Sequence, residues 1–361
     1  MFSHILAPLD GSPLAVCVLP HVVAVARATG AQITLLRVLE RSGNNDLAGD
    51  VNPFDWHMQK LEAQAYLDEL AEQLLHSVDL PVKTDLLEGS AAVQIVEHAQ
   101  RTGADLVILS SHGRGGLSDW HTSSVAQKVI QRAGISVLLT RAWRPEALCE
   151  PAHWGERSYQ RILVPLDGSP RAECVLPIAT ALAEHAAALW LLHVVTRPEL
   201  FQRMPLTTDE QTLLEHIVQR NQQQATRYLE QLQARLVPTP RTHILANHNT
   251  ATMLHHFVAQ EQIDLVVLCA HGFSGQSQWP FGSLAHSFIN YGETPLLIVQ
   301  DMPRLSSGAI RTAVHSAVQP ARTASVATPT ESQLASQYGG NSAISAVRHA
   351  PGVDRNHAYA F

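Results

Sequence analysis

The chain has 361 residues, of which 45% are apolar, enough for two ordinary domains with buried cores. It carries 25 basic and 32 acidic residues, a net charge of −7, and this balance argues against a dominant nucleic-acid surface. No apolar run is long enough to span a membrane and the N-terminus lacks a signal-peptide pattern, so we expect a cytoplasmic protein without membrane contact. The four cysteines form no CxxC pair, which suits a reducing compartment and predicts no zinc site.

The first half of the chain alternates short apolar runs with amphipathic stretches, beginning with the strand HILAP and the turn LDGSP. In the helix that follows, Ser12 is expected to cap the start, Pro20 to kink the middle and Gly30 to end it. The predicted strands cover residues 4–8, 31–40, 82–89, 104–110 and 135–141, and the predicted helices cover residues 14–30, 54–78, 90–103 and 123–134.

The second half repeats this order, with RILVPLDGSP in place of HILAPLDGSP, so that Asp167 corresponds to Asp10. Ser169 and Pro177 take the places of Ser12 and Pro20. Continuous apolar strands between amphipathic helices predict a parallel sheet covered on both faces. We therefore expect an α/β fold made of two tandem five-stranded parallel doubly wound sheets. The predicted strands of the second half are residues 161–165, 188–195, 241–246, 263–269 and 294–300.

The repeat also predicts the domain organisation of the chain. One domain covers residues 1–141 and the other residues 160–301, joined by a linker at residues 142–159 that carries proline and charge. Residues 302–361 are rich in Ala, Ser and Thr and have little periodicity. We predict that they form a disordered C-terminal tail, with a helix somewhere in it as the alternative.

A ligand site is expected where the strand order reverses, between the first and the fourth strand of each half. Two loops should meet there, PLDGS and the glycine-containing loop after the fourth strand. In the second half this loop leads to Gly282 and Ser283 at a helix start, whose N–H groups could hold a phosphate; an ordinary helix cap is the alternative. The loop is not a Walker A motif, because no Lys precedes the serine, and not a dinucleotide fingerprint, because it follows the fourth strand.

These motifs resemble those of the universal stress proteins. The resemblance rests on ILxPLDGS at the first strand and on ADLVILSSHGRGGL and IDLVVLCAHGFSG at the fourth, and it covers residues 1–141 and 160–301. Some family members bind ATP through a glycine, two residues, a glycine, nine residues, then glycine and Ser or Thr. The second half keeps this spacing and departs from it only at Cys269, where the first glycine is expected. The first half lacks two of the three glycines and has Ser110 and Ser123 in their places.

The resemblance implies an adenine-nucleotide site in which Asp167 and Val194 meet the adenine and ribose while the glycines and Ser283 hold ribose and phosphates. A serine in place of a glycine adds a Cβ where the backbone should touch phosphate, and it strains the backbone if the position needs a positive φ. We therefore expect the second half to be the nucleotide site and the first to be degenerate, structural or specific for a smaller or differently charged ligand. The implied residues are Pro165, Asp167, Val194, Leu268, Gly272, Gly282 and Ser283 in the second half and, in the weaker first site, Asp10, Val38, Gly113, Ser123 and Ser124.

Several residues near these loops have two interpretations. Each turn aspartate either contacts the ligand, by facing the nucleoside or by meeting a phosphate through Mg²⁺, or merely builds the turn or caps the first helix. His112 and His271 could polarise a phosphate, but a hydrogen bond that pins the loop is favoured. Cys269 is expected to be a small buried residue rather than a nucleophile, because no Cys–His–acid set is evident. No metal site is predicted, since the adjacent His255 and His256 should point in different directions along a helix.

The sequence leaves three functions open. The favoured one is a regulatory stress-response module that binds ATP or another adenine nucleotide, with or without Mg²⁺. The alternative is a nucleotide-independent interaction or scaffold protein for unidentified protein partners. The resemblance implies pairing through the fifth strand of each half, SVLLT with PLLIV, which would make the two halves a pseudo-dimer within one chain. A homodimer of two chains is the other arrangement that the resemblance leaves open. An ATP hydrolase is disfavoured because no general base is evident, although slow hydrolysis would be compatible with binding.

Overall fold

The computed structural model describes the chain at residues 1–40, 52–113, 122–141, 150–183, 187–197, 207–247, 249–273 and 280–301. The predicted disordered tail lies outside these ranges, as does the part of the predicted linker at residues 142–149. Among the helices in the described ranges, none has the length and apolar character needed to cross a membrane.

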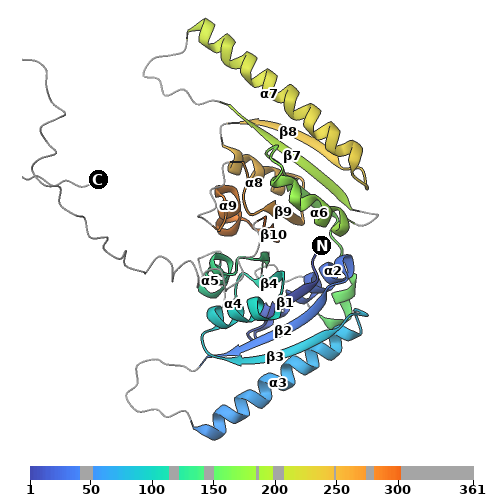
Figure 1. The fold of residues 1–361 in the computed structure, drawn as a ribbon, viewed down its shortest axis with the longest axis vertical. Helices are drawn as coiled ribbons and strands as arrows, with labels where there is room; N and C mark the ends of the chain where they lie inside the picture. Colours follow the sequence, from blue (N-terminus) through green and yellow to red (C-terminus); the bar gives the residue numbers. More distant parts are fainter. Residues whose placement is uncertain are drawn as a thin grey trace, which may run out of the picture. The chain divides into compact units, whose positions relative to one another are not determined.

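Each half of the chain forms five parallel strands, as predicted (Figure 1). The strands of the first half are β1 (His4–Pro8), β2 (Gln32–Leu39), β3 (Val82–Glu88), β4 (Leu106–Ser110) and β5 (Ser136–Thr140). Those of the second half are β6 (Arg161–Pro165), β7 (Ala188–Thr196), β8 (Arg241–Asn247), β9 (Leu265–Cys269) and β10 (Leu296–Val299). The strand orders are β3-β2-β1-β4-β5 and β8-β7-β6-β9-β10, so the order reverses beside β1 and β6 as expected.

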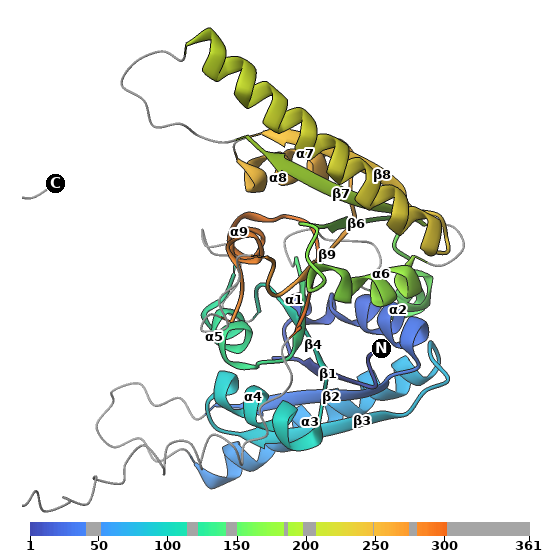
Figure 2. The same cartoon turned by 45° about the horizontal axis from the view of Figure 1, so that its top comes forward.

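Helices cover both faces of the strands because alternate strand residues point to opposite sides. The helices of the described ranges are α1 (Pro13–Val16), α2 (Leu19–Thr29), α3 (Pro53–Leu75), α4 (Ala91–Thr102), α5 (Ser124–Arg132), α6 (Leu176–Leu182), α7 (Thr208–Arg235), α8 (Thr250–Gln260) and α9 (Ser283–Tyr291), with 3₁₀ helices η2 (Pro151–Glu156) and η3 (Ala172–Val175). Ile5 belongs to the core cluster shared with α2, α3, α6 and α7, whereas its neighbour Leu6 belongs to the cluster shared with α4, α5, α8 and α9. The long helices α3 and α7 lie along the outer strands of their halves (Figure 2).

The first helix of the first half is interrupted, and that of the second half begins as a 3₁₀ helix, so the prediction of one continuous kinked helix is wrong. In the first half α1 ends at Val16 and α2 begins at Leu19, which places Pro20 in the first turn of a new helix. Pro177 has the same place in α6, after the short η3. Proline has no N–H to donate, and the first turn is where a helix does not need that donor. The predicted cap by Ser12 and the predicted end at Gly30 are both confirmed.

The two halves are joined into one ten-stranded sheet by the antiparallel pairing of β5 and β10, which confirms the predicted pairing of SVLLT with PLLIV. The two predicted five-stranded sheets are thus continuous with each other. Leu138 lies opposite Leu297 and Leu139 opposite Leu296, and all four side chains are fully buried. Since β5 and β10 occupy each other's edges, the outer edges of the sheet are β3 and β8.

Arg141, directly after β5, adds a polar contact between the two halves. Its guanidinium donates hydrogen bonds to the carbonyl oxygens of Phe288, at 2.6 Å, and Ile289, at 3.4 Å, near the end of α9. Burial lowers the pKa of Arg141 to about 10, and the nearby Glu293 carboxylate opposes that shift. The side chain therefore places a cation at the carbonyl end of a helix, where the helix dipole favours it.

Replacing Arg141 with Met should remove this contact while keeping most of the apolar stem. We expect the free energy of unfolding, measured by urea denaturation, to fall by about 2 kcal/mol, because buried carbonyl oxygens lose a charged donor. The control is Arg132→Met at the exposed end of α5, which should cost little. Equal losses in the two variants would contradict the assigned role of Arg141.

Candidate functional site

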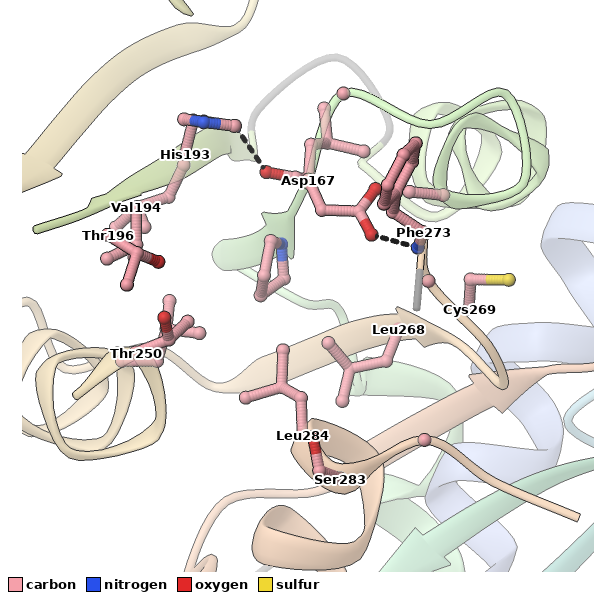
Figure 3. Close-up of a pocket in the computed structure, with 18 of the residues that line it drawn as sticks. Asp167, His193, Val194, Thr196, Thr250, Leu268, Cys269, Phe273, Ser283 and Leu284 are labelled. Carbon is pink, nitrogen blue, oxygen red and sulfur yellow. Dashed lines mark hydrogen bonds between the residues drawn. The ribbon is translucent and has the colours of Figure 1, made fainter. Parts of the chain in front are cut away.

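A cavity of about 810 Å³ opens at the carboxyl ends of β6, β7 and β9 (Figure 3). Its walls come from the loops after β6 and β9, from α7, and from the first turns of α8 and α9. The cavity lies beside β6, at the switch point where the sequence places the second-half site. All the residues predicted for that site line the cavity, namely Pro165, Asp167, Val194, Leu268, Gly272, Gly282 and Ser283.

Asp167 connects the two loops that meet at this switch point. The Ser169 N–H donates to Oδ1 of Asp167 at 2.9 Å, which builds the turn, and the Phe273 N–H donates to Oδ2 at 2.5 Å across the loops. Burial raises the pKa of Asp167, but the hydrogen bonds from Ser169 and Phe273 outweigh it and hold the pKa below its usual value. The carboxylate is therefore ionised at neutral pH and serves the turn interpretation, with an additional contact that the sequence did not predict.

The loop glycines allow the turn aspartates to approach. A Cβ added to Gly272 would collide with Oδ2 of Asp167, and a Cβ added to Gly113 would collide with Oδ2 of Asp10. Neither glycine has a positive φ, so the requirement is for space rather than for backbone freedom. In both halves the glycine is thus explained by the carboxylate beside it.

The residue before the fourth long helix differs between the halves in its side chain but not in its backbone. Gly282 before α9 has φ −71° and ψ 168°, and Ser123 before α5 has φ −64° and ψ 157°. The positive φ that would make serine strained is therefore absent. The Ser123 hydroxyl accepts a hydrogen bond from the Ala126 N–H at 3.3 Å, whereas Gly282 provides no side-chain cap. The first N–H groups of α9 are consequently without a side-chain cap where Gly282 and Ser283 line the cavity.

The universal stress protein family model matches residues 1–141 and 158–300. The chain belongs to the universal stress protein family. A universal stress protein of Methanocaldococcus jannaschii is 27% identical over 157 residues, covering 40% of this chain and 86% of that protein. One from Mycobacterium tuberculosis is 25% identical over 226 residues, covering 61% of this chain and 70% of that protein. A crystal structure of a universal stress protein from Archaeoglobus fulgidus, 16% identical, shares the fold, with a TM-score of 0.54 over 83% of this chain and 98% of its own.

The first domain of this universal stress protein arranges its predicted residues around the matching switch point. Asp10 lies against Gly113, Val38 stands near the end of β2, and Ser123 and Ser124 begin α5. A cation also lies at this turn, because the guanidinium of Arg37 packs on Gly11 and over the Tyr66 ring, 5.1 Å from its centroid.

The second domain has His193 at the corresponding position of β7, one residue before Val194. Its Nδ1 lies 2.8 Å from the Leu166 carbonyl oxygen (Figure 3). Burial lowers the pKa of His193, and the contacts with Leu166 and Asp167 only partly oppose that shift. The ring is therefore neutral at pH 7, and the two domains differ in charge beside their aspartates.

Sequence reasoning missed the polar residues that α7 contributes to the cavity. Asn221, Gln224 and Tyr228 line it, on the same helix face as the buried Ala225 and Leu229. Burial and the nearby Glu173 carboxylate raise the pKa of Tyr228 above its usual value. Polar side chains within the inward stripe of an amphipathic helix were the available signal. The other polar residues missed are His193, Thr196 and Thr250.

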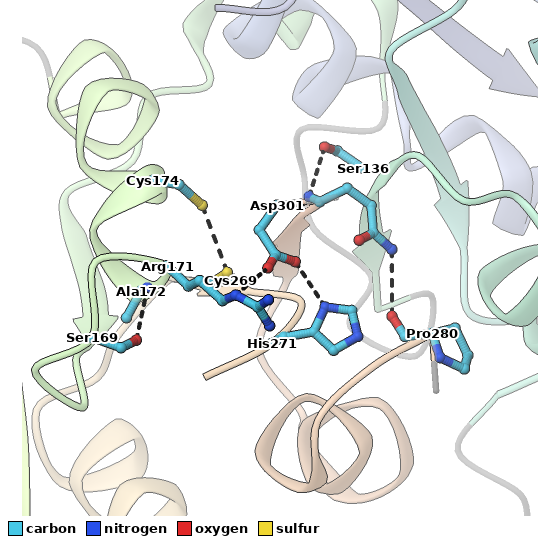
Figure 4. Close-up of polar contacts among 10 residues, drawn as sticks. Ser136, Ser169, Arg171, Ala172, Cys174, Cys269, His271, Pro280 and Asp301 are labelled. Atoms are coloured by element: carbon cyan, nitrogen blue, oxygen red, sulfur yellow. Dashed lines mark hydrogen bonds and ion pairs between the residues drawn. The ribbon is translucent and has the colours of Figure 1, made fainter. Parts of the chain in front are cut away.

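His271, which precedes the loop glycine, has the predicted role of holding the loop (Figure 4). Its Nδ1 lies 2.7 Å from Oδ1 of Asp301, just after β10, and both side chains are buried. The second carboxylate oxygen of Asp301 lies 3.5 Å from Nε of Arg171. Asp301 therefore ties the β9 loop to the turn before η3, a partner that the sequence did not reveal.

Gly272→Ala should displace the Asp167 carboxylate and lower the free energy of unfolding by about 1 kcal/mol, because the hydrogen bond from Phe273 is lost. In an Asp167→Ala background the same change should cost nearly nothing, since the colliding oxygen is gone. Urea denaturation of the four proteins measures the coupling. Gly282→Ser, which copies the first domain, is the control and should be nearly neutral. An equal loss of unfolding free energy for Gly272→Ala in both backgrounds would contradict the conclusion that Gly272 makes room for the Asp167 carboxylate.

Proposed function

We propose that this universal stress protein is a regulatory module that binds ATP or another adenine nucleotide in its second domain. The observation that supports this most is the start of α9, whose first N–H groups have no side-chain cap. This helix start lines the same cavity as all the other residues predicted for the site. An uncapped helix start is a favourable place for a phosphate group. The first domain closes the corresponding start of α5 with the Ser123 hydroxyl.

The cavity offers suitable surfaces for the other parts of such a ligand. Val194, Leu254 and Leu268 provide an apolar wall for a planar base. Asn221 and Gln224 provide amide donors and acceptors that can read the edge of the base. The Asp167 carboxylate has lone pairs beyond those used by Ser169 and Phe273, and these can accept hydrogen bonds from ribose hydroxyls.

The charge of the cavity bears on the form in which a triphosphate would bind. No Lys or Arg is among the described residues that line it, and the adjoining residues 274–279 contain none in their sequence. Among the described residues no group of three His, Cys, Asp or Glu is placed to hold a metal ion. We therefore propose that Mg²⁺ would enter with the nucleotide, bound to its phosphates, and reduce the repulsion from Asp167.

We propose binding rather than catalysis. The ionisable side chains around the cavity already have structural partners, Asp167 with Ser169 and Phe273, His193 with Leu166, and His271 with Asp301. The lowered pKa values of Asp167 and His193 also make both groups weak bases at neutral pH, whereas an effective general base has a pKa near the working pH. The alternative function, a nucleotide-independent scaffold, draws support from the β5–β10 pairing, which gives the chain the pseudo-dimer that this function requires.

Isothermal titration of the full chain with Mg²⁺-ATP separates these functions. We expect binding to the wild type and a loss of roughly tenfold or more in affinity for Gly282→Val, because the branched side chain enters the space beside the first N–H groups of α9. Ser123→Val, the matched change in the first domain, should leave the affinity unchanged. Melting temperatures of both variants check that they are folded. Absence of binding by the wild type would favour the scaffold, and a loss confined to Ser123→Val would place the site in the first domain.

A further inference from the structure

Two thiols face each other beside the cavity of the second domain. Cys174 lies on η3 and Cys269 ends β9, and their sulfur atoms are 3.6 Å apart (Figure 4). Cys174 is exposed, Cys269 is partly buried, and both are free cysteines. Cys269 also lines the cavity, at the position where the ATP-binding pattern of the family has its first glycine.

The first domain shows what the same place looks like without the second thiol. Its equivalent of Cys174 is Cys17, and its equivalent of Cys269 is Ser110, whose hydroxyl oxygen lies 3.8 Å from the Cys17 sulfur. The geometry of the pair is thus a property of the repeated fold, since both domains bring these two side chains together. The second domain differs because a cysteine stands where the first domain has a serine, and this difference creates a dithiol.

We propose that Cys174 and Cys269 form a peroxide-reactive dithiol that closes a reversible disulfide in the wall of the second cavity. A disulfide needs a sulfur–sulfur distance of about 2.05 Å, so the two atoms have to approach by roughly 1.5 Å from their 3.6 Å separation. The exposed position of Cys174 gives the oxidant access to one of the two thiols, and the second waits within contact distance of it.

The environment of the pair assigns a role to each thiol. The hydrogen bond with Cys269 lowers the pKa of the exposed Cys174, so Cys174 ionises more readily than Cys269 and is the attacking thiol. The same hydrogen bond, together with burial and the neighbouring Cys174 thiolate, raises the pKa of Cys269. Once Cys174 is oxidised it is no longer a thiolate, so its negative charge no longer raises the pKa of Cys269.

The reaction uses hydrogen peroxide as the two-electron oxidant. The Cys174 thiolate attacks one peroxide oxygen, the O–O bond breaks, and hydroxide leaves and is protonated to water, which gives a sulfenic acid. The Cys269 sulfur then attacks the Cys174 sulfur, the S–O bond breaks, and the departing hydroxide takes up the proton of the Cys269 thiol as a second water. In sum, two thiols and one peroxide become one disulfide and two waters.

The disulfide would join the two loops that form the site. η3 follows the turn that contains Asp167, and the Ala172 N–H of η3 donates a hydrogen bond to the Ser169 hydroxyl of that turn. Cys269 precedes His271 and Gly272 in the loop after β9. A covalent bond between Cys174 and Cys269 would link the segment that follows the Asp167 turn to the start of the loop after β9. We therefore expect oxidation to change the affinity of the cavity for its ligand, a consequence that rests on the proposed nucleotide binding, whereas formation of the disulfide does not.

The test uses the full chain with Cys17→Ser and Cys149→Ser, which leaves only the two thiols of interest. The reduced protein is treated with equimolar hydrogen peroxide, alkylated with N-ethylmaleimide and weighed by intact mass spectrometry. We expect a product lighter by two hydrogen atoms that takes up no maleimide and recovers both thiols with dithiothreitol. Peptide mapping of the oxidised wild type should give the same Cys174–Cys269 link, which covers the case that the variant folds poorly.

Cys269→Ser in the same background recreates the serine of the first domain and is the matched control. It should stop at an oxidised Cys174 without an intramolecular link. The proposal is overturned if both thiols remain open to maleimide after peroxide, or if Cys174 is oxidised to the sulfinic acid while Cys269 stays free.

A titration of reduced and oxidised protein with Mg²⁺-ATP measures the effect on the cavity. We expect the two affinities to differ by roughly fivefold or more and to become equal again after reduction. Equal affinities despite a mapped disulfide would refute the coupling. If the reduced protein binds no nucleotide, the proposed function fails, and the mass measurement still decides whether the dithiol reacts.

Discussion

A carboxylate packed against a glycine holds together the two loops at each switch point of this protein. Asp167 lies so close to Gly272 that no side chain fits between them, and Asp10 lies in the same way against Gly113. In the second domain the contact is completed by the hydrogen bond from the Phe273 N–H. The aspartate belongs to the turn after the first strand and the glycine to the loop after the fourth, so this contact brings together the two loops that line the second-domain cavity.

The two domains share this contact and differ in what surrounds it. The first domain caps α5 with the Ser123 hydroxyl and places the Arg37 guanidinium on its turn. The second leaves the start of α9 without a side-chain cap and has the neutral His193 in the corresponding place. Gly282 does not differ from Ser123 in backbone conformation. The divergence therefore lies in the side chains: the first domain presents a helix-capping hydroxyl and a cation, whereas the second presents an uncapped helix start and a neutral imidazole.

Much of the fold and site could be predicted from local patterns, and the rest depends on contacts between distant segments. Apolar strands and the repeated PLDGS turn predict the strand order, and the strand order brings Asp167 and Gly282 to one cavity. The polar residues of α7 were missed because the long segment was taken only as a helix. The break before Pro20 was missed because proline fits the first turn of a new helix as well as a kink. The partnership of His271 with Asp301 joins segments 30 residues apart, and no local pattern indicates it.

We propose that only one of the two similar domains binds the nucleotide. Native mass spectrometry of the full chain with Mg²⁺ and an adenine nucleotide measures the number of ligands bound to each chain directly. One nucleotide bound to each chain, lost in Gly282→Val and retained in Ser123→Val, is the result that our proposal predicts. Two nucleotides bound to each chain, or one that survives Gly282→Val, would contradict the assignment of the site to the second domain.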